Sequence, residues 1–388
     1  QRLQNLPPYI FATIAEKLDV LRTTGAEVIR LDIGNPDMPP PPHVIEKLRE
    51  GASNTTKHGY SGYRGVATFR EAVAEHYQRR YDVSLDPDKE VLPLLGSKEG
   101  IVNLTSAFVD VGDCVLVPEI GYPAYMMATR LCGGNLAWVK MDPDQNYLPI
   151  LNDISEVDAS GAKLMWVNYP NNPTGGIATQ EDYAAMVDFC RRHDVLLASD
   201  NPYVDVMYEQ QKAGSVLQAD PALNHTVEFM SFSKSYNMAG WRLGAAVGNP
   251  DALKHLLHIK SNMDSGHFKA IYDAGTAALL ETPDAWIAER NAIYERRRDL
   301  ILDALPSIGL EAPHKPMGAM YIWARRTNGK DTSSYIDAAL EQAHVSLAPG
   351  AAYGPGGEGY IRLSVGLPDD EIARALERLA QWYTVWSQ

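Results

Sequence analysis

The chain has 388 residues, of which 45% are hydrophobic and 22% charged, and its formal net charge is −14. This composition is typical of a globular protein with a sizeable core and excludes a mainly disordered chain. The acidic balance argues against a nucleic-acid partner, because binding a phosphate backbone requires clustered Lys and Arg. The apolar runs are far shorter than the ~18 residues of a membrane span, so we expect no membrane partner.

The cysteines give a first indication of the compartment. Cys114, Cys132 and Cys190 are odd in number and far apart, which favours free thiols in a reducing environment. The first residues lack the apolar core of a signal peptide. We therefore expect a cytoplasmic protein. No Cys/His spacing typical of a metal site occurs, so no metal is expected.

Helix and strand patterns alternate after a proline-rich stretch at residues 36–42, which predicts an extended linker. Helices are predicted after capping boxes that begin at Thr68 and Thr179, and across residues 101–108. Short apolar runs lie between the helices, at residues 114–117, 164–167, 195–198, 227–230 and 243–247. Such runs predict a mostly parallel sheet with helices on both faces.

The last quarter of the chain has a different pattern. A long helix is predicted at residues 281–304, and short strand patterns follow at 320–323, 345–347 and 360–365. The fold class is therefore α/β, with a large domain whose mostly parallel sheet is sandwiched by helices and a smaller α+β domain. We expect the large domain to span residues 43–280 and the small domain residues 281–388. The segment 1–42 is expected to pack on the small domain.

The strongest chemical signal is SFSKSYNMAGWR, which runs from Ser231 to Arg242 directly after an apolar run. This order places Lys234 in a loop at the end of a strand, where open α/β sheets bind ligands. The hydroxyls of Ser231 and Ser233 and the guanidinium of Arg242 can surround a phosphate. Lys234 is then left for covalent chemistry. The match of residues 354–359 to G-x-G-x-x-G is interpreted as a loop, because it precedes a strand and contains a proline.

Other polar residues follow other predicted strands in the same way. Asn172 lies in NYPNNPTG after one strand, Asp200 ends the next, and Tyr203 follows three residues later. Taken alone, Asp200 could be a helix cap and Asn172 a turn residue. Together with the lysine they offer one ligand an amide, an anion, a phenol and an amine. This set suits pyridoxal phosphate, which has an aldehyde for a lysine, a pyridine nitrogen for an aspartate and a phosphate.

On these motifs the whole chain resembles the fold-type I pyridoxal-phosphate aminotransferases of class I/II. The segments SFSKSYNMAGWR and GSKEG (residues 96–100) are most similar to the subgroup with LL-diaminopimelate, alanine and aspartate aminotransferases. The segments LPPYIF (6–11) and KSNMDSG (260–266) favour the diaminopimelate side. The resemblance implies an aspartate-aminotransferase-like fold and an enzyme of amino-acid biosynthesis. It also implies a homodimer with shared active sites.

The resemblance also implies individual roles around the cofactor. Lys234 would form the Schiff base with pyridoxal phosphate, and Asp200 would pair with the pyridine nitrogen. Tyr203 and Asn172 would hydrogen-bond the ring hydroxyl. Tyr122 would stack on the ring, although a tyrosine that only packs is the alternative. Lys234, Asp200 and Tyr203 form the catalytic set in this assignment.

Phosphate and substrate contacts complete the assignment. The phosphate would bind residues at the loop and at a helix N-terminus, namely Ser231, Ser233, Arg242 and the backbone amides of Ser97 and Lys98. Arg362 would clamp the substrate α-carboxylate, and the backbone of Gly34 would closely approach the substrate. Tyr60 would reach the phosphate of the neighbouring subunit, with Tyr63 as a competitor for that role.

Substrate choice is the least specific part of the prediction. Tyr9, Lys98 and Asn262 match substrate or cofactor contacts of diaminopimelate-like members. No clearly placed second arginine is available for the distal acid of a dicarboxylate, which argues against a strict aspartate aminotransferase. The predicted reaction moves an amino group between an L-amino acid, with LL-diaminopimelate favoured, and a 2-oxo acid such as 2-oxoglutarate, with ping-pong kinetics. Alternatives are alanine or aspartate specificity and a β- or γ-lyase. A non-catalytic regulator is disfavoured because a binding module needs no proton-transfer lysine.

Overall fold

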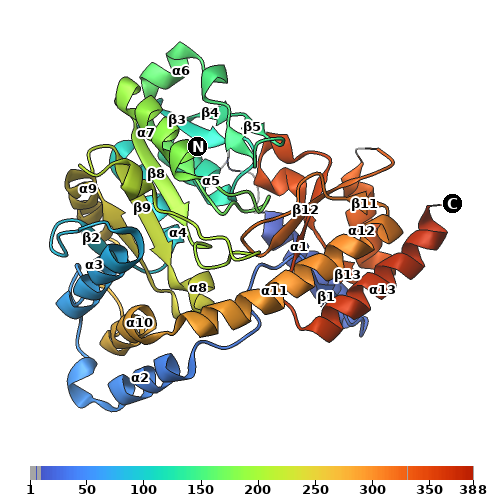
Figure 1. Ribbon diagram of the computed structural model, residues 1–388. Helices are drawn as coiled ribbons and strands as arrows, with labels where there is room; N and C mark the ends of the chain where they lie inside the picture. Colours follow the sequence, from blue (N-terminus) through green and yellow to red (C-terminus); the bar gives the residue numbers. More distant parts are fainter. Residues whose placement is uncertain (1–5, 7–9, 330, 388) are drawn as a thin grey trace.

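The computed structural model describes residue 6 and residues 10–329 and 331–387. Within these ranges a large and a small sheet lie side by side (Figure 1). The large sheet has seven strands in the spatial order β2 (Val91–Leu94), β10 (Gly244–Gly248), β9 (Thr226–Ser231), β8 (Leu196–Asn201), β7 (Ala162–Val167), β3 (Cys114–Pro118) and β4 (Asn135–Val139). Only β10 runs antiparallel to its neighbours, so the parallel strands end at one common edge.

Helices cover both faces of the large sheet (Figure 1). One face carries α4 (Ser97–Phe108), α5 (Pro123–Cys132) and α9 (Pro250–Lys260), and the other carries α3 (Ala67–Tyr81), α7 (Gln180–His193) and α10 (Lys269–Glu281). Along β9, Phe229 packs toward α4, whereas Met230 packs on the opposite side. This alternation follows from the two-residue period of a strand. It means that neighbouring residues of one strand face different layers.

The small sheet has its own core. Its antiparallel strands are, in order, β11 (Leu310–Glu311), β12 (Tyr321–Arg326), β15 (Tyr360–Ser364) and β14 (Ala348–Pro349), and its helices are α12 (Thr332–Gln342) and α13 (Asp369–Trp386). The long helix α11 (Asp284–Ala304) runs from beside α10 to this sheet (Figure 1). The aspartate-aminotransferase-like α/β fold class is therefore confirmed. The predicted domain boundaries themselves stay a prediction.

The N-terminal segment lies against the small sheet. Strand β1 (Ile29–Arg30) pairs in parallel with β13 (Val345–Ser346). Helix α1 (Ile10–Thr23) packs through Leu18 against Leu340, and the Lys17 amine lies 2.6 Å from the Asp337 carboxylate. These contacts bring the residues just after β1 to the boundary between the two sheets.

Several short elements complete the described chain. They are α2 (Pro42–Ser53), α6 (Glu156–Gly161), α8 (Phe232–Ser235), the hairpin β5 (Met141–Asp142) and β6 (Leu148–Pro149), and 3-10 turns at Thr55–Lys57, Leu151–Asp153, Val216–Ala219, Ala239–Trp241, Leu305–Ile308, Gly350–Tyr353 and Pro355–Gly357. Helix α2 packs on α10, where Gly51 lies directly against Ala270. No helix within the described ranges is both long and apolar enough to cross a membrane.

One of the two predicted capping boxes is wrong. Helix α3 begins at Ala67, one residue before Thr68, and its N-cap Val66 is extended and makes no side-chain cap. The predicted cap residue therefore lies inside the first turn, where its hydroxyl cannot act as the N-cap acceptor. The box at Thr179 is confirmed, because its side chain accepts from the Asp182 amide and the Asp182 carboxylate accepts from the Thr179 amide.

Candidate active site

A cavity of about 400 Å³ opens where β7, β8 and β9 end, between the large sheet and the small domain. It gathers most of the residues singled out from the sequence: Gly34, Ser97, Lys98, Tyr122, Asn172, Asp200, Tyr203, Ser231, Ser233, Lys234, Arg242 and Arg362. Tyr60 and Asn262 do not line it, and Tyr60 is 87% exposed. Tyr9 lies outside the described residues. Among the described residues no group of His, Cys, Asp and Glu could hold a metal ion.

Lys234 occupies the short helix α8, directly after β9. Ser231 caps this helix by accepting a hydrogen bond from the Ser233 amide at 3.2 Å. Lys234 is partly buried, and its amine donates to the carbonyl of Gly34. Burial, helped by the positive charges of Arg362 and Arg242, lowers the pKa of Lys234 to about 7. A substantial fraction of the amine is therefore neutral near pH 7, as nucleophilic attack on a carbonyl requires.

Asp200 stands at the end of β8 as a buried carboxylate that lacks a full set of partners. Its Oδ2 accepts from the Tyr125 hydroxyl at 2.8 Å, while Oδ1 has no partner among the described residues. Burial raises the pKa of Asp200 to about 7, although hydrogen bonds from Tyr125 and Ser97 act in the opposite direction. A buried oxygen without a partner is costly, so this site is suited to a ligand that brings a donor or a cation. A protonated pyridine nitrogen fits that requirement.

A phosphate-sized anion can be held at the start of α4. The free backbone amides of a helix N-terminus attract anions, and α4 begins at Ser97 in the cavity wall. Gly96 has φ +83°, and a Cβ added there would meet the guanidinium of Arg242. The glycine therefore allows the arginine and the helix terminus to face the same space. With the hydroxyls of Ser231 and Ser233 in the same wall, these residues fit the phosphate of the cofactor.

Arg362 reaches the cavity from β15 of the small sheet. Its Nη1 donates to Asn172 Oδ1 at 2.9 Å and its Nη2 to the carbonyl of Asp32 at 2.6 Å. Its Nε is buried and has no hydrogen-bond partner among the described residues. The ring of Tyr321 lies 3.9 Å from the guanidinium carbon. An arginine held this firmly, with a donor left over, can bind a carboxylate.

Several residues of the site were missed in the sequence, and four of them make polar or ring contacts with predicted site residues or with each other. Tyr125 lies three residues after Tyr122, a spacing that puts both on one side of a helix and could have revealed it. Arg30 and Asp32 line the cavity and form a bidentate salt bridge, with both N–O distances 2.6 Å. Their i, i+2 spacing before Gly34 was an available signal. Tyr321 had no local signal, because the packing of the small sheet alone brings it there.

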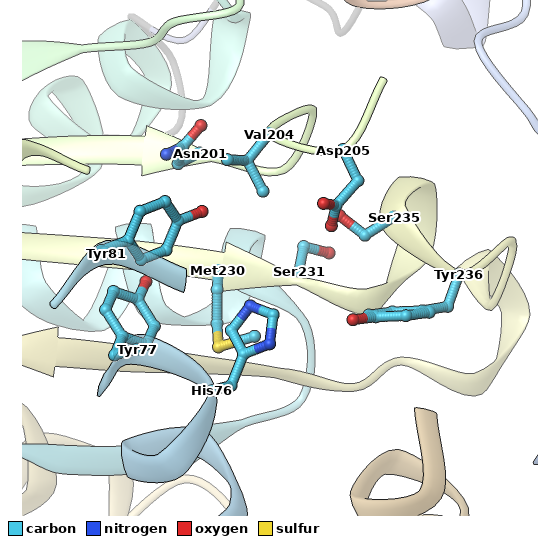
Figure 2. A pocket seen from close by; sticks show the side chains of 10 residues that line it. All are labelled: His76, Tyr77, Tyr81, Asn201, Val204, Asp205, Met230, Ser231, Ser235 and Tyr236. Atoms are coloured by element: carbon cyan, nitrogen blue, oxygen red, sulfur yellow. The ribbon is translucent and has the colours of Figure 1, made fainter. Parts of the chain in front are cut away.

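A second polar cluster lies beneath Lys234, on the opposite side of β8 and β9. Figure 2 shows its side chains, among them Asp205 and Ser235, which face each other around a cavity of only about 10 Å³. Arg290 on α11 donates to the carbonyls of Lys234 and Ser235 and, at 2.5 Å, to the carbonyl of Asp205. The backbone of the lysine-bearing helix is thus held from below by a buried guanidinium.

Comparisons with known proteins show the family to which the chain belongs. Residues 26–379 match the sequence model of the family "Aminotransferase class I and II". The chain is 43% identical to the LL-diaminopimelate aminotransferase of Moorella thermoacetica, covering 98% of this chain and 97% of that protein. It is 40% identical to the enzyme of the same name from Dehalococcoides mccartyi, with 98% of both covered.

Solved structures show the same relationship. The substrate-bound BacF structure from Bacillus subtilis has a TM-score of 0.92 at 33% identity, covering 98% of this chain and 96% of that one. A single mutant of Thermus thermophilus aspartate aminotransferase has a TM-score of 0.91 at 29% identity, with 98% of both chains covered. The chain therefore belongs to the class I and II aminotransferase family and is a pyridoxal-phosphate-dependent transaminase.

Proposed function

We propose that this aminotransferase takes its amino group from LL-diaminopimelate and passes it to a 2-oxo acid such as 2-oxoglutarate. The relatives named LL-diaminopimelate aminotransferase, at 40% and 43% identity, support this substrate. One observation supports the chemistry: a lysine with a lowered pKa, a buried carboxylate and an arginine with a spare donor line one cavity. Alanine or aspartate specificity is the alternative. A β- or γ-lyase is not favoured, because these relatives are aminotransferases.

The proposed roles of the residues follow from their surroundings. When bound, pyridoxal phosphate supplies an aldehyde for amine exchange and a ring that withdraws electrons from the substrate Cα. The Lys234 amine, neutral in part near pH 7, would hold the cofactor through its aldehyde and, when free, would accept the proton of the substrate Cα. Asp200 would face the ring nitrogen as a carboxylate and so favour its protonated form. Arg362 orients the substrate by binding its α-carboxylate through Nε and one Nη.

The remaining residues hold the cofactor in place. Tyr203 and Asn172 would hydrogen-bond its ring hydroxyl, and Tyr122, at the N-cap position of α5 in the cavity wall, would stack on its ring. The phosphate would bind to residues of the α4 terminus and of the lysine loop: Ser97, Lys98, Ser231, Ser233 and Arg242. The backbone of Gly34 borders the substrate, opposite the lysine that donates to it.

A substrate panel tests the proposed specificity. Purified holoenzyme should give its highest kcat/KM with LL-diaminopimelate among diaminopimelate, alanine, aspartate and glutamate, with 2-oxoglutarate as acceptor. Absence of any turnover with diaminopimelate, alongside turnover of alanine or aspartate, would replace it with that alternative. A lyase would reveal itself by releasing a 2-oxo acid from the amino acid without a second substrate.

We further propose a cytoplasmic homodimer in which Tyr60 completes the partner's phosphate site. Tyr60 and Tyr63 are 87% and 53% exposed, and neither lines the cavity of its own chain. Asn262 is also outside that cavity, and its side-chain amide donates to the His258 carbonyl at 2.8 Å. Its proposed contact, like that of Tyr9, rests on family resemblance alone.

Complementation between two inactive variants tests the shared site. Tyr60→Ala and Lys234→Ala chains, mixed under conditions of demonstrated subunit exchange, form heterodimers with one site that carries both lesions and one that carries neither. Activity should return to roughly a quarter of wild type per site for random pairing of equal amounts. No recovery would remove Tyr60 from the partner's site. Tyr63→Ala in place of Tyr60→Ala distinguishes the two tyrosines.

A further inference from the structure

Two tyrosines from different sheets meet through their hydroxyls at the cavity wall. Tyr203 follows β8 of the large sheet, and Tyr321 begins β12 of the small sheet. Their hydroxyl oxygens are 2.8 Å apart, and their rings meet edge to face with centroids 5.6 Å apart. Both side chains are buried, with 3% of Tyr321 and 5% of Tyr203 exposed. The contact is therefore a buried hydrogen bond that links the two sheets at the site.

Tyr321 also contacts two other parts of the site. Its ring lies 3.9 Å from the guanidinium carbon of Arg362, the proposed carboxylate clamp. A Cβ added to Gly34 would overlap the Tyr321 hydroxyl, so only a glycine permits this approach. The carbonyl of that same Gly34 accepts from Lys234. One side chain thus touches residues from the N-terminal segment, the large sheet and the small sheet.

The chemistry of the hydroxyl pair determines which tyrosine donates. A phenol has a single proton but can also accept, so in a pair only one member donates to the other. If Tyr203 gives its proton to the ring hydroxyl oxygen of the cofactor, Tyr321 must be the donor between the two tyrosines. A hydrogen bond donated into the Tyr203 oxygen polarises its O–H and strengthens the bond that it donates onward.

We propose that Tyr321 is a positioning residue, which directs the Tyr203 proton toward the cofactor ring oxygen and couples that hydroxyl to Arg362. This inference rests on the proposed roles of Tyr203 and Lys234. It assigns to the small domain a part in cofactor chemistry, in addition to carrying the carboxylate clamp. The other ionisable groups that affect Tyr203 are Arg362 and Tyr122, and Tyr321→Phe leaves both in place.

The visible absorbance of the lysine–cofactor Schiff base, titrated with pH in purified holoenzyme, tests the proposal. The hydrogen bond from Tyr203 is strongest when the ring oxygen carries its full negative charge, which favours loss of the Schiff-base proton. Tyr321→Phe should weaken that bond. The midpoint of the absorbance titration, which reports the pKa of the Schiff-base proton, should then rise by about half to one pH unit, as expected for a weakened hydrogen bond. In a Tyr203→Phe background the same change should have no further effect.

A matched control separates positioning from general loosening of the fold. Tyr335 is also a buried tyrosine of the small domain, and its hydroxyl donates to the Ile308 carbonyl at 2.8 Å. Tyr335→Phe removes one buried hydrogen bond without touching the cavity and should leave the midpoint unchanged. An unchanged midpoint in Tyr321→Phe, an equal shift in both variants, or a full shift that persists without Tyr203 would overturn the inference. A wild-type holoenzyme without any Schiff-base band would instead overturn the proposed role of Lys234.

Discussion

Asp200 and Asn201 are neighbours at the end of β8, yet they face two very different polar environments. Asp200 faces the cavity of about 400 Å³, whereas Asn201 faces the closed cluster of about 10 Å³ in Figure 2. The same division separates Lys234 from Ser235, which are neighbours in α8 directly after β9. Both environments are rich in buried ionisable side chains. They differ in whether the buried carboxylate has a cationic neighbour: Arg80 lies 2.8 Å from Asp205, whereas no cation is among the described groups that shift the pKa of Asp200.

The carboxylate of the closed cluster has cationic neighbours. The carboxylate of Asp205 is fully buried but lies 2.8 Å from the Arg80 guanidinium, and this charge, with His76 and Arg290, keeps the pKa of Asp205 below its usual value. In the open cavity, burial instead raises the pKa of Asp200 to about 7, and among the described residues only hydrogen bonds from Tyr125 and Ser97 oppose this shift. This contrast is consistent with the proposed roles, in which Asp205 is held within the fold and Asp200 is left to meet the cofactor.

The largest expected effect is the loss of Lys234. Lys234→Ala should eliminate the Schiff-base band and lower turnover by more than the ~10²–10⁴-fold that acid–base catalysis alone supplies. Exposed Lys163 serves as the matched control, and Lys163→Ala should retain both the band and the activity. A borohydride-reducible adduct that persists in Lys234→Ala would contradict the assignment.

Breaking the Asp205–Arg80 ion pair should lower the free energy of unfolding more than it lowers turnover. Asp205→Asn removes the counterion of Arg80, whose side chain is 27% exposed, so the loss should be smaller than the about 3–5 kcal/mol that breaking a fully buried pair costs. Chemical denaturation of the holoenzyme should show this loss, while kcat per folded molecule changes much less. If stability stayed the same and kcat collapsed, the closed cluster would belong to the catalytic site.

Replacing Asp200 in the open cavity should have the opposite result, with a large loss of turnover and no loss of stability. Asp200→Asn removes a charge aimed at the cofactor and should lower kcat by about 10²–10³-fold, the range for losing one preorganised electrostatic group. The cofactor-free variant should unfold no more easily than the wild type, because a buried unpaired charge is replaced by a neutral amide. Wild-type turnover in this variant would remove Asp200 from the chemistry.

The smallest expected effect is a pH dependence of the cofactor-free protein. The folded pKa of Asp200 is raised, so its contribution to stability is complete below pH ~4 and is lost as the pH rises through about 7. Asp200→Asn should therefore gain stability relative to wild type between pH ~4 and ~7, by on the order of 1–3 kcal/mol. Urea midpoints of both proteins across this range measure the difference. A constant difference would mean that the folded carboxylate is not perturbed.

Much of the architecture could be predicted locally. The apolar runs at β3, β7, β8 and β9 and the capping box of α7 have periods and end signals that are properties of short segments. Strands β2 and β4 were missed, since the first contains Pro93 and the second is largely exposed. The capping box at Thr68 failed because Val66 already takes the extended cap conformation.

The sequence by itself determined which chemistry the site carries, because Lys234, Asp200 and Arg242 lie at fixed positions after strands or in the loop that follows one. Only the tertiary structure decided what surrounds them. Tyr321 and Arg362 enter from a different sheet, and the direction of each pKa shift depends on burial and on charges brought from elsewhere in the chain. A local sequence pattern indicates the period of a helix or strand. The desolvation of an ionisable side chain and its pairing with other charges depend on every element that packs around it.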